Sequence, residues 1–319
     1  MNIPAKTLAL LLTYAFSLVG CGATSMPIGG SSPTESLNTL GGERPEFLNA
    51  NGQNKDLLYI SNYYSSTVAV YSWPELHNNQ NLGGFVNQIG LCVDKRGDVY
   101  VANTNANDIV EYRHGGAKPI HTLMDLPGYY PSSCAVDPAT GDLAVTNLGY
   151  GDYGSKTANV LVFHHAKGTP KVYDISSIYY DYFCGYDNRS DLVVDGSSQS
   201  VVAFAILHPG KAKLEPLTLN VSFKYPGGIQ WDGSHMAIGN QQDMIYQFDI
   251  KGNTGTEIGA TTLQGANGVY GFFIAGGKVI APELGAGEAE IYRYPSGGAP
   301  LTSITGLEQP EAAVVSVGN

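Results

Sequence analysis

The chain has 319 residues, 43% of them hydrophobic and only 14% charged, so it is long enough to bury a large core. Its formal net charge is −11, and no Lys/Arg cluster opposes that sign, which argues against nucleic acid as a partner. Forty glycines and 21 tyrosines favour short strands and tight turns, and helix is expected to be scarce.

Residues 1–20 have the form of a secretory signal peptide. Lys6 precedes an apolar run at residues 8–19, which is shorter than the roughly 20 residues that span a bilayer. The run ends on "LVGC" at residues 18–21, which resembles the bacterial lipobox. The resemblance implies that Cys21 is lipidated and becomes the mature N-terminus. The alternative is an ordinary secretory signal followed by a chance cysteine.

Gly22 stands where lipoproteins of this kind commonly carry an Asp if they stay at the inner membrane. The resemblance therefore implies a lipid-anchored protein of the bacterial cell envelope, at the outer membrane, facing the periplasm or the surface. Residues 21–54 comprise the lipidated Cys and a segment rich in Gly, Ser, Pro and Asn, which predicts a flexible tether. The membrane is thus an expected partner through Cys21.

Residues 55–319 repeat one pattern: an apolar stretch, a turn with Asp and Gly, a strand that ends on a small polar residue, and a strand with an aromatic. The second strands of six units end at intervals of 41, 44, 49, 44 and 43 residues, on Asn62, Asn103, Asn147, Gly196, Asn240 and Glu283. Such intervals match a four-stranded propeller blade. The first unit lacks a first strand, and residues 310–317 supply one that can pair with it and close a ring.

This pattern resembles the NHL-repeat family and related six-bladed propellers, including the virginiamycin-lyase, YncE and gluconolactonase kinds. The resemblance implies an all-β fold, a six-bladed β-propeller of four-stranded blades closed by the C-terminal strand. No catalytic signature of these families is matched residue for residue, so the resemblance says little about activity. The GxSxG, HExxH, Walker, CxxC and EF-hand patterns are also absent, and we expect neither an enzyme nor a cofactor.

The strand-ending residues fall on one face of the predicted ring, where second and third strands join and where one blade connects to the next. We call this face the mouth, because propellers usually bind ligands there. Tyr-rich loops accompany it, and Tyr suits glycan, peptide or protein surfaces. The predicted mouth site consists of Asn62, Tyr63, Tyr64, Asn103, Asn147, Tyr150, Asp152, Tyr153, Tyr182, Asn240 and Glu283. In the alternative, the Asn residues only end turns and the tyrosines pack between blades.

Two further sequence patterns are explained without a bound nucleotide or metal. The third unit carries an insertion, "GYGDYG" at residues 149–154, which matches GxGxxG but opens no helix, so we predict a mouth loop that sets specificity. Turns on the face opposite the mouth begin with Asp94, Asp137, Asp187 and Asp232, and we predict that these Asp residues only stabilise their turns.

The gluconolactonase-like families hold a divalent cation on the propeller axis, and their resemblance implies an alternative function. In it the protein is a metal-dependent hydrolase or lyase. The side chains nearest to the required positions are oxygen donors suited to Ca²⁺, namely Asn87, Asp181, Asn267 and Glu311.

The remaining cysteines and an adjacent His pair complete the candidates. Cys134 and Cys184 are predicted to face alike in neighbouring inner strands and Cys92 to face the other way, which favours buried thiols over the one possible disulfide. His164 and His165 are predicted to point to opposite faces of a strand, so that they cannot share a ligand.

Together these features favour a non-enzymatic, lipid-anchored binding or scaffold module. We expect a monomer whose mouth is presented to a glycan, a peptide or a partner protein of the envelope.

Overall fold

The structure is a computed structural model that describes residues 55–125, 129–148, 158–174, 178, 180–198 and 201–318, with only the backbone of Asp181. These residues belong to the second of two compact units, Pro45–Asn319. The predicted signal peptide, Cys21 and the tether lie outside the described residues. So do Tyr150, Asp152 and Tyr153 of the predicted mouth site.

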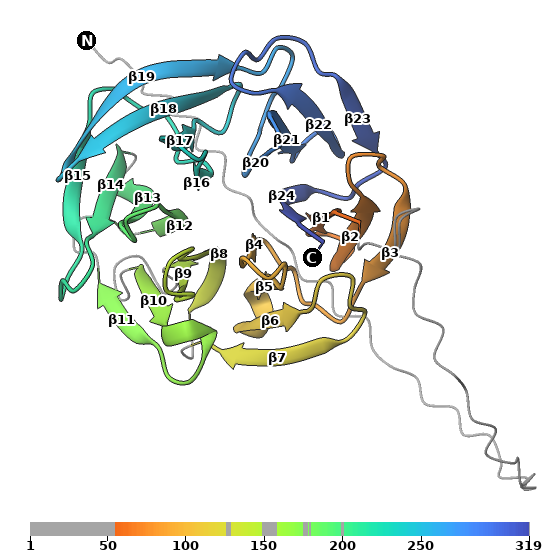
Figure 1. Cartoon of the computed structure of the whole chain (residues 1–319), viewed down its shortest axis with the longest axis horizontal. Coiled ribbons are helices and arrows are strands. Elements are labelled where there is room, and N and C mark those ends of the chain that lie inside the picture. The colour runs from red at the N-terminus through yellow and green to blue at the C-terminus, as the bar shows by residue number, and fades with distance from the viewer. Residues whose placement is uncertain are drawn as a thin grey trace, which may run out of the picture. The chain divides into compact units, whose positions relative to one another are not determined.

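The described residues form 24 β-strands arranged as a propeller-like ring of sheets (Figure 1). Four sheets have four strands each, and all their strand pairs are antiparallel. From the axis outward their strands are β24 (Pro310–Ser316), β1 (Leu57–Asn62), β2 (Thr67–Ser72) and β3 (Asn78–Leu82); β4 (Leu91–Val93), β5 (Val99–Asn103), β6 (Asp108–Tyr112) and β7 (Pro119–Met124); β8 (Tyr130–Val136), β9 (Leu143–Leu148), β10 (Asn159–Phe163) and β11 (Lys171–Asp174); β20 (Phe273–Ala275), β21 (Lys278–Glu283), β22 (Glu288–Arg293) and β23 (Thr302–Thr305).

The remaining strands form one eight-stranded sheet, where six separate four-stranded blades are expected from the sequence. Its outer strands β15 and β19 pair in parallel, with Thr218 opposite Thr254 and Leu219 opposite Gly255. The nine-residue β19 is long enough to reach its neighbour, which joins the two sets of strands at their edges. The sheet contains β12 (Tyr180–Tyr186), β13 (Leu192–Ser198), β14 (Val201–Leu207), β15 (Glu215–Leu219), β19 (Thr254–Thr262), β18 (Met244–Lys251), β17 (Met236–Gly239) and β16 (Ile229–Trp231).

The hydrophobic core lies between neighbouring sheets. Every residue of β1 is buried, because its alternate side chains pack against the sheets on either side. Tyr59 lies in one apolar layer with Val101 of β5, whereas Ile60 lies in another with Ile280 of β21. Strand β24, from the end of the chain, pairs antiparallel with β1, so the first and last parts of the repeat share one sheet.

The turns opposite the mouth have the predicted structure. Each of the four leading Asp residues accepts a hydrogen bond at Oδ1 from the backbone N–H two residues further on, at 2.8 or 2.9 Å. These bonds form Asx turns, which explain the Asp without any ligand. The prediction that Asp94, Asp137, Asp187 and Asp232 stabilise turns is confirmed.

Two 3₁₀ turns are the described helical elements, Thr104–Ala106 and His164–Ala166. Within the described residues, no helix has the length and apolar character needed to cross a membrane. The second turn corrects the prediction for His164 and His165. Strand β10 ends at Phe163, and His165 takes a left-handed φ of 49°, so the two rings lie side by side, with centroids 3.9 Å apart and planes tilted by 38°.

Candidate functional site: the mouth and the axial cavity

Two of the strand-ending Asn residues hold the segment that leads into the innermost strand of their own sheet. The Oδ1 of Asn62 accepts a hydrogen bond from the backbone N–H of Glu308 at 3.3 Å. The Oδ1 of Asn103 accepts one from the N–H of Val86 at 2.6 Å. Both side chains are buried. The recurrence of Asn thus has a structural cause, because it ties a connecting segment to the strand beside it.

Asn147 is fully buried and has the same kind of role. Its Nδ2 donates to the carboxylate of Asp125, in the segment before β8, at 3.3 Å and to Oδ1 of Asn159 at 2.9 Å. Asn240 instead caps its own turn, since its Oδ1 accepts three successive backbone N–H groups, those of residues 242–244. Asn62, Asn103 and Asn147 are thus buried in contacts within the chain, and Asn240 is half-buried.

Glu283 replaces Asn in the sixth unit and keeps the same contact. Its Oε2 accepts a hydrogen bond from the N–H of Asn267, in the segment before β20, at 3.2 Å. Burial and a hydrogen bond with Glu290 raise the pKa of Glu283 to about 7. The change from Asn to Glu therefore places a titratable carboxyl at this position, near Glu290, to which the Tyr292 hydroxyl donates.

Gly196 occupies the position in the fourth unit because a side chain does not fit there. A Cβ at Gly196 would lie 2.1 Å from the carbonyl oxygen of Tyr180 and 2.4 Å from the Ile178 side chain. The preceding residue, Asp195, instead joins its strand to neighbouring segments through its carboxylate. Its carboxylate accepts the N–H of Phe183 at 3.1 Å and that of Gly227 at 2.9 Å.

The described tyrosines of the predicted mouth site differ in exposure. Tyr64 is 62% exposed and packs edge to face on Tyr63, with ring centroids 5.8 Å apart. Tyr182 is half-buried and packs edge to face on Tyr270 at 6.4 Å. Of these three predicted tyrosines, Tyr64 alone presents most of its surface to solvent.

Exposed apolar side chains gather at the mouth beyond what the sequence indicated. They lie in the β1–β2 turn, in the connections before β4 and β16, at the end of β7 and at the starts of β12 and β14. Six of the 11 exposed large hydrophobic residues in the described chain are at these places: Tyr64, Val86, Met124, Tyr180, Val201 and Tyr225. Val86, Met124 and Val201 were missed, because a single exposed aliphatic residue in a loop has no recognisable pattern in one sequence.

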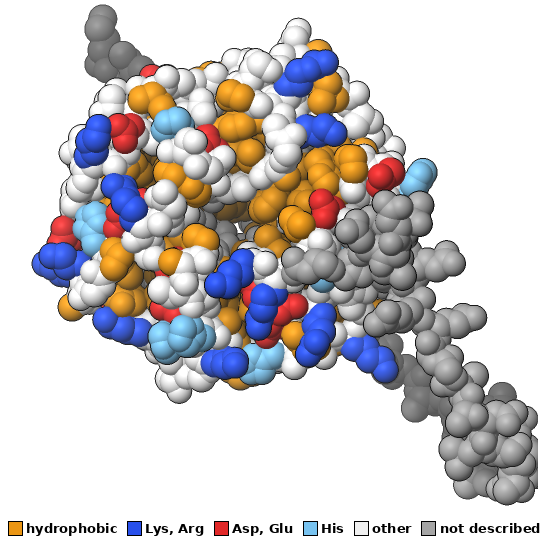
Figure 2. Space-filling model, in the orientation of Figure 1, with side chains coloured by type: hydrophobic (Ala, Val, Ile, Leu, Met, Phe, Trp, Pro, Cys, Tyr) orange, Lys and Arg blue, Asp and Glu red, His pale blue; other side chains and the backbone are white. Residues whose placement is uncertain are grey.

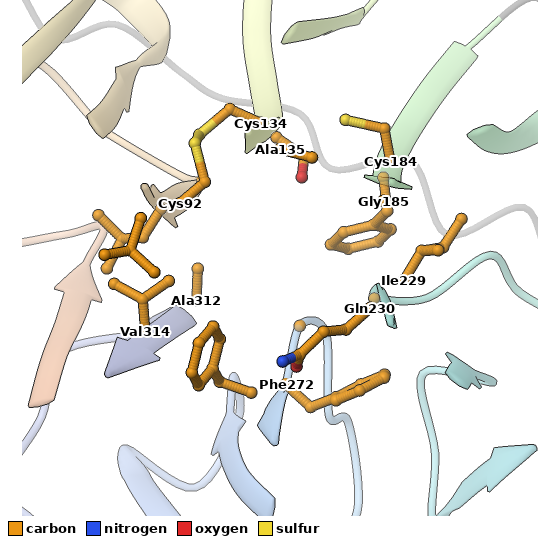
Figure 3. Close-up of a pocket in the computed structure, with 18 of the residues that line it drawn as sticks. Cys92, Cys134, Ala135, Cys184, Gly185, Ile229, Gln230, Phe272, Ala312 and Val314 are labelled. Atoms are coloured by element: carbon orange, nitrogen blue, oxygen red, sulfur yellow. A yellow bond between two sulfur atoms is a disulfide. The ribbon is translucent and has the colours of Figure 1, made fainter. Parts of the chain in front are cut away.

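A cavity of about 310 Å³ lies on the axis of the ring, lined by residues of the six innermost strands and of the segments that lead into them. Figure 3 shows Ile229, Phe272 and Val314 around it, and Figure 2 shows the centre of the ring hollowed among hydrophobic side chains. The wall is therefore mostly apolar. A cavity of this size with a few polar groups is the usual form of a small-molecule site.

Two of the polar side chains that line this cavity, Gln230 and Glu311, differ in their hydrogen bonding. Gln230 is satisfied by the backbone of Ile274, which it contacts through Nε2 at 3.1 Å and Oε1 at 2.7 Å. Glu311 is buried, and no group in the described part of the chain hydrogen bonds to its carboxyl. Burial raises the pKa of Glu311 to about 8. It therefore keeps a proton at neutral pH and is available to a ligand in this cavity.

A disulfide joins Cys92 of β4 to Cys134 of β8 in the cavity wall (Figure 3). The prediction of buried thiols is wrong for this pair. Cys134 and Cys184 do face alike, each toward the preceding sheet, and Cys92 faces the other way. In a ring of sheets, opposite facing is what brings side chains of neighbouring sheets together. Cys184 is buried in the next apolar layer, outside the disulfide.

The four oxygen donors of the metal alternative have different environments. Glu311 lines the axial cavity, but Asn87 and Asn267 do not. The Asn87 side chain accepts a hydrogen bond at Oδ1 from Asn105 Nδ2 at 2.9 Å, and its Nδ2 donates to the carbonyl oxygen of Tyr63 at 3.3 Å. The side chain of Asp181 lies outside the described residues. Asn87 and Asn267 therefore do not form one set of metal ligands with Glu311.

Solved structures share this arrangement of sheets. Neither a family model nor a curated protein matches the chain. A chain in the crystal structure of the nidogen/laminin complex matches with 12% identity, a TM-score of 0.65, and coverage of 82% of this chain and 98% of that chain. The fold is a β-propeller.

Two further solved structures share this fold. A protein of unknown function from Bacteroides caccae is 11% identical with a TM-score of 0.61, and a functionally unknown protein from Desulfotomaculum acetoxidans is 10% identical with a TM-score of 0.56. Each match covers 82% of this chain and 99% of the other. At such identities the likeness concerns the β-propeller fold alone.

Proposed function

We propose that this β-propeller is a binding or scaffold module of the bacterial cell envelope, anchored by a lipid on Cys21, whose mouth binds a peptide or a partner protein. The observation that carries the proposal is the group of exposed apolar residues at the mouth, which we call the apolar rim: Tyr64, Val86, Met124, Tyr180, Val201 and Tyr225. Exposed apolar surface that forms a contiguous patch is typical of protein interaction sites, and these six side chains lie on the same face.

The composition of the apolar rim favours a polypeptide over a glycan. Half of its members are Val or Met, with 47% exposure for Val86, 65% for Met124 and 66% for Val201. Tyr and Met are enriched in protein interfaces, whereas aliphatic side chains offer little to a sugar hydroxyl. Two of the predicted Asn residues contribute to this surface indirectly, because Asn103 holds the backbone of Val86 and Asn147 holds Asp125, next to Met124.

The Cys92–Cys134 disulfide supports an envelope location, because disulfides persist in oxidising compartments and are rare in the cytosol. We also propose that the eight-stranded sheet counts as two blades. The order β12-β13-β14-β15 and the order β16-β17-β18-β19 each repeat the order of the four-stranded sheets. On that count the propeller has six blades, as the NHL-repeat resemblance implies.

We expect the triple variant Tyr64→Ser, Met124→Ser, Val201→Ser to lose partner binding. Removing three anchors from an interface core should weaken capture at least about tenfold, because buried aromatic and aliphatic anchors provide most of the binding energy. The measurement is quantitative pull-down of envelope proteins by the purified protein. The matched control is Val172→Ser, Ile258→Ser, Leu301→Ser, which removes exposed apolar residues elsewhere.

Unchanged capture by the mouth variant would contradict the proposal, as would an equal loss in the control variant. Treating the extract with proteinase K before the pull-down separates the ligand classes. A peptide or protein partner disappears after this treatment, whereas persistent capture would identify a glycan instead.

The metal-dependent hydrolase or lyase remains the alternative function, and Glu311 on the axis is the observation that favours it. Because the Asn87 side chain is hydrogen-bonded elsewhere and Asn267 does not line the cavity, we expect Ca²⁺ to leave the melting temperature of the wild type unchanged. Thermal unfolding with Ca²⁺ and with EDTA measures this. A Ca²⁺-dependent rise that is lost in Glu311→Gln would overturn our preference and support the hydrolase.

A further inference from the structure

We propose that Asp142, His164 and His165 form a surface binding site for a divalent transition-metal cation such as Zn²⁺, on the face opposite the mouth. These three are the one group of His, Cys, Asp or Glu side chains in the described residues whose ligand atoms all lie within 4.8 Å of one another. The site is independent of the proposed binding function.

Two turns of one sheet bring the three residues together. Asp142 directly precedes β9, and the His pair directly follows β10, its antiparallel partner. The left-handed φ of 49° at His165 and 51° at Ala166 folds the chain back, so that both imidazoles lie on the side of Asp142. Non-glycine residues in this region are strained, and such strain is concentrated at functional sites. In Figure 2, His side chains lie at the surface in the sector of β10 and β11.

The distances between donor atoms fit a tetrahedral cation. Asp142 Oδ1 lies 2.9 Å from His164 Nδ1 and 3.9 Å from His165 Nδ1. Zinc bonds of about 2.0–2.1 Å to nitrogen and oxygen place tetrahedral donors about 3.3 Å apart. This spacing lies between the two observed distances, so rotation of the exposed side chains is sufficient to admit the ion. Side-chain exposures of 77% for His164 and 58% for His165 leave that movement free.

Contacts within the two turns orient Asp142 and His165. Asp142 Oδ1 accepts the backbone N–H of His165 at 2.9 Å, and His165 Nδ1 donates to the carbonyl oxygen of Thr140 at 2.7 Å. Because a carbonyl oxygen only accepts, His165 binds the metal through Nδ1 after its exposed ring turns away from Thr140 and the ring proton moves to Nε2. The backbone N–H of His165 holds the Asp142 carboxylate in place, as outer partners of metal ligands do.

The donor set selects the class of cation. Two imidazoles and one carboxylate suit Zn²⁺, Cu²⁺ or Ni²⁺, whereas Ca²⁺ and Mg²⁺ require mostly oxygen ligands. Three protein ligands leave further coordination positions to water in this exposed setting. A bound ion would link the β8–β9 turn to the β10–β11 turn and stabilise both.

The test is isothermal titration of the untagged, full-length mature protein with ZnCl₂. We expect one Zn²⁺ per chain and at least about tenfold weaker binding in His164→Gln and in His165→Gln, since each removes a ligand. Asp142→Asn is expected to weaken binding in the same direction. The control is His77→Gln, which removes an exposed His in another turn.

The His variants keep their backbone and are checked for unchanged melting temperature without metal, so lost binding is separable from lost folding. In the wild type, Zn²⁺ is expected to raise the melting temperature, and this rise disappears in the two His variants. The proposal is overturned if the wild type shows no heat of binding, or if His77→Gln weakens binding as much as His164→Gln and His165→Gln do.

Discussion

Replacing Glu311 by Gln is expected to make the protein more stable at pH 8 and to remove a fall in stability between pH 5 and pH 8. Burial raises the pKa of Glu311 to about 8, whereas a Glu in the unfolded chain ionises near its ordinary value of about 4.3. Below that value both states hold the proton. As the pH rises, the unfolded state loses its proton first, so the unfolding free energy falls until the folded state also ionises near pH 8.

The size of this effect is large for one side chain. At 1.36 kcal/mol for each pKa unit, the difference between the two states corresponds to at most about 5 kcal/mol. Urea unfolding of the wild type and of Glu311→Gln at pH 5, 6.5 and 8.5 measures it. The control is Glu308→Gln, an exposed residue in the same connecting segment. Parallel pH profiles for the wild type and Glu311→Gln would show that the carboxyl is not buried as described.

A carboxyl that costs the fold stability and faces a cavity is a candidate recognition group. Most of the cavity wall is apolar, and the Gln230 side chain is already hydrogen-bonded. A ligand group that donates a hydrogen bond or carries a positive charge would give Glu311 the partner that the described residues do not supply. Of the two parts of the candidate site, the axial cavity thus offers polar selectivity and the apolar rim offers contact area.

The sequence predicted the strands well, because the repeat places turn residues at regular intervals. The predicted second strands end on Asn62, Asn103 and Glu283, as β1, β5 and β21 do. Prediction was weaker where a feature depends on a neighbouring sheet. The pairing of β15 with β19 depends on the edges of two sheets, and no periodicity within either strand encodes it.

The candidate site was predicted in part for the same reason. The recurrence of Asn was visible in the sequence, but its partners, such as Val86 for Asn103, come from a connecting segment that has no repeated pattern. The His pair was predicted to lie on a regular strand, whereas the chain leaves the strand at Phe163 and turns. Such a turn depends on local φ values that the residue types His and Ala do not indicate.

Removing the Cys92–Cys134 disulfide is expected to cost about 4 kcal/mol of unfolding free energy, the loop-closure value for a separation of 42 residues. Cys92→Ser with Cys134→Ser is compared with Cys184→Ser by urea unfolding. Cys184 is also buried, in the next apolar layer, so the comparison separates the crosslink from the loss of a buried sulfur. We expect the Cys184→Ser variant to lose less stability than the double variant.

Thiol labelling under denaturing conditions checks the crosslink directly. The wild type is expected to gain two labelled thiols on reduction, whatever the state of Cys21, because only Cys92 and Cys134 change. Labelling that is the same before and after reduction would show that the two sulfurs are not bonded. In that case the two innermost strands β4 and β8 would be held by packing alone, and the disulfide would no longer support an envelope location.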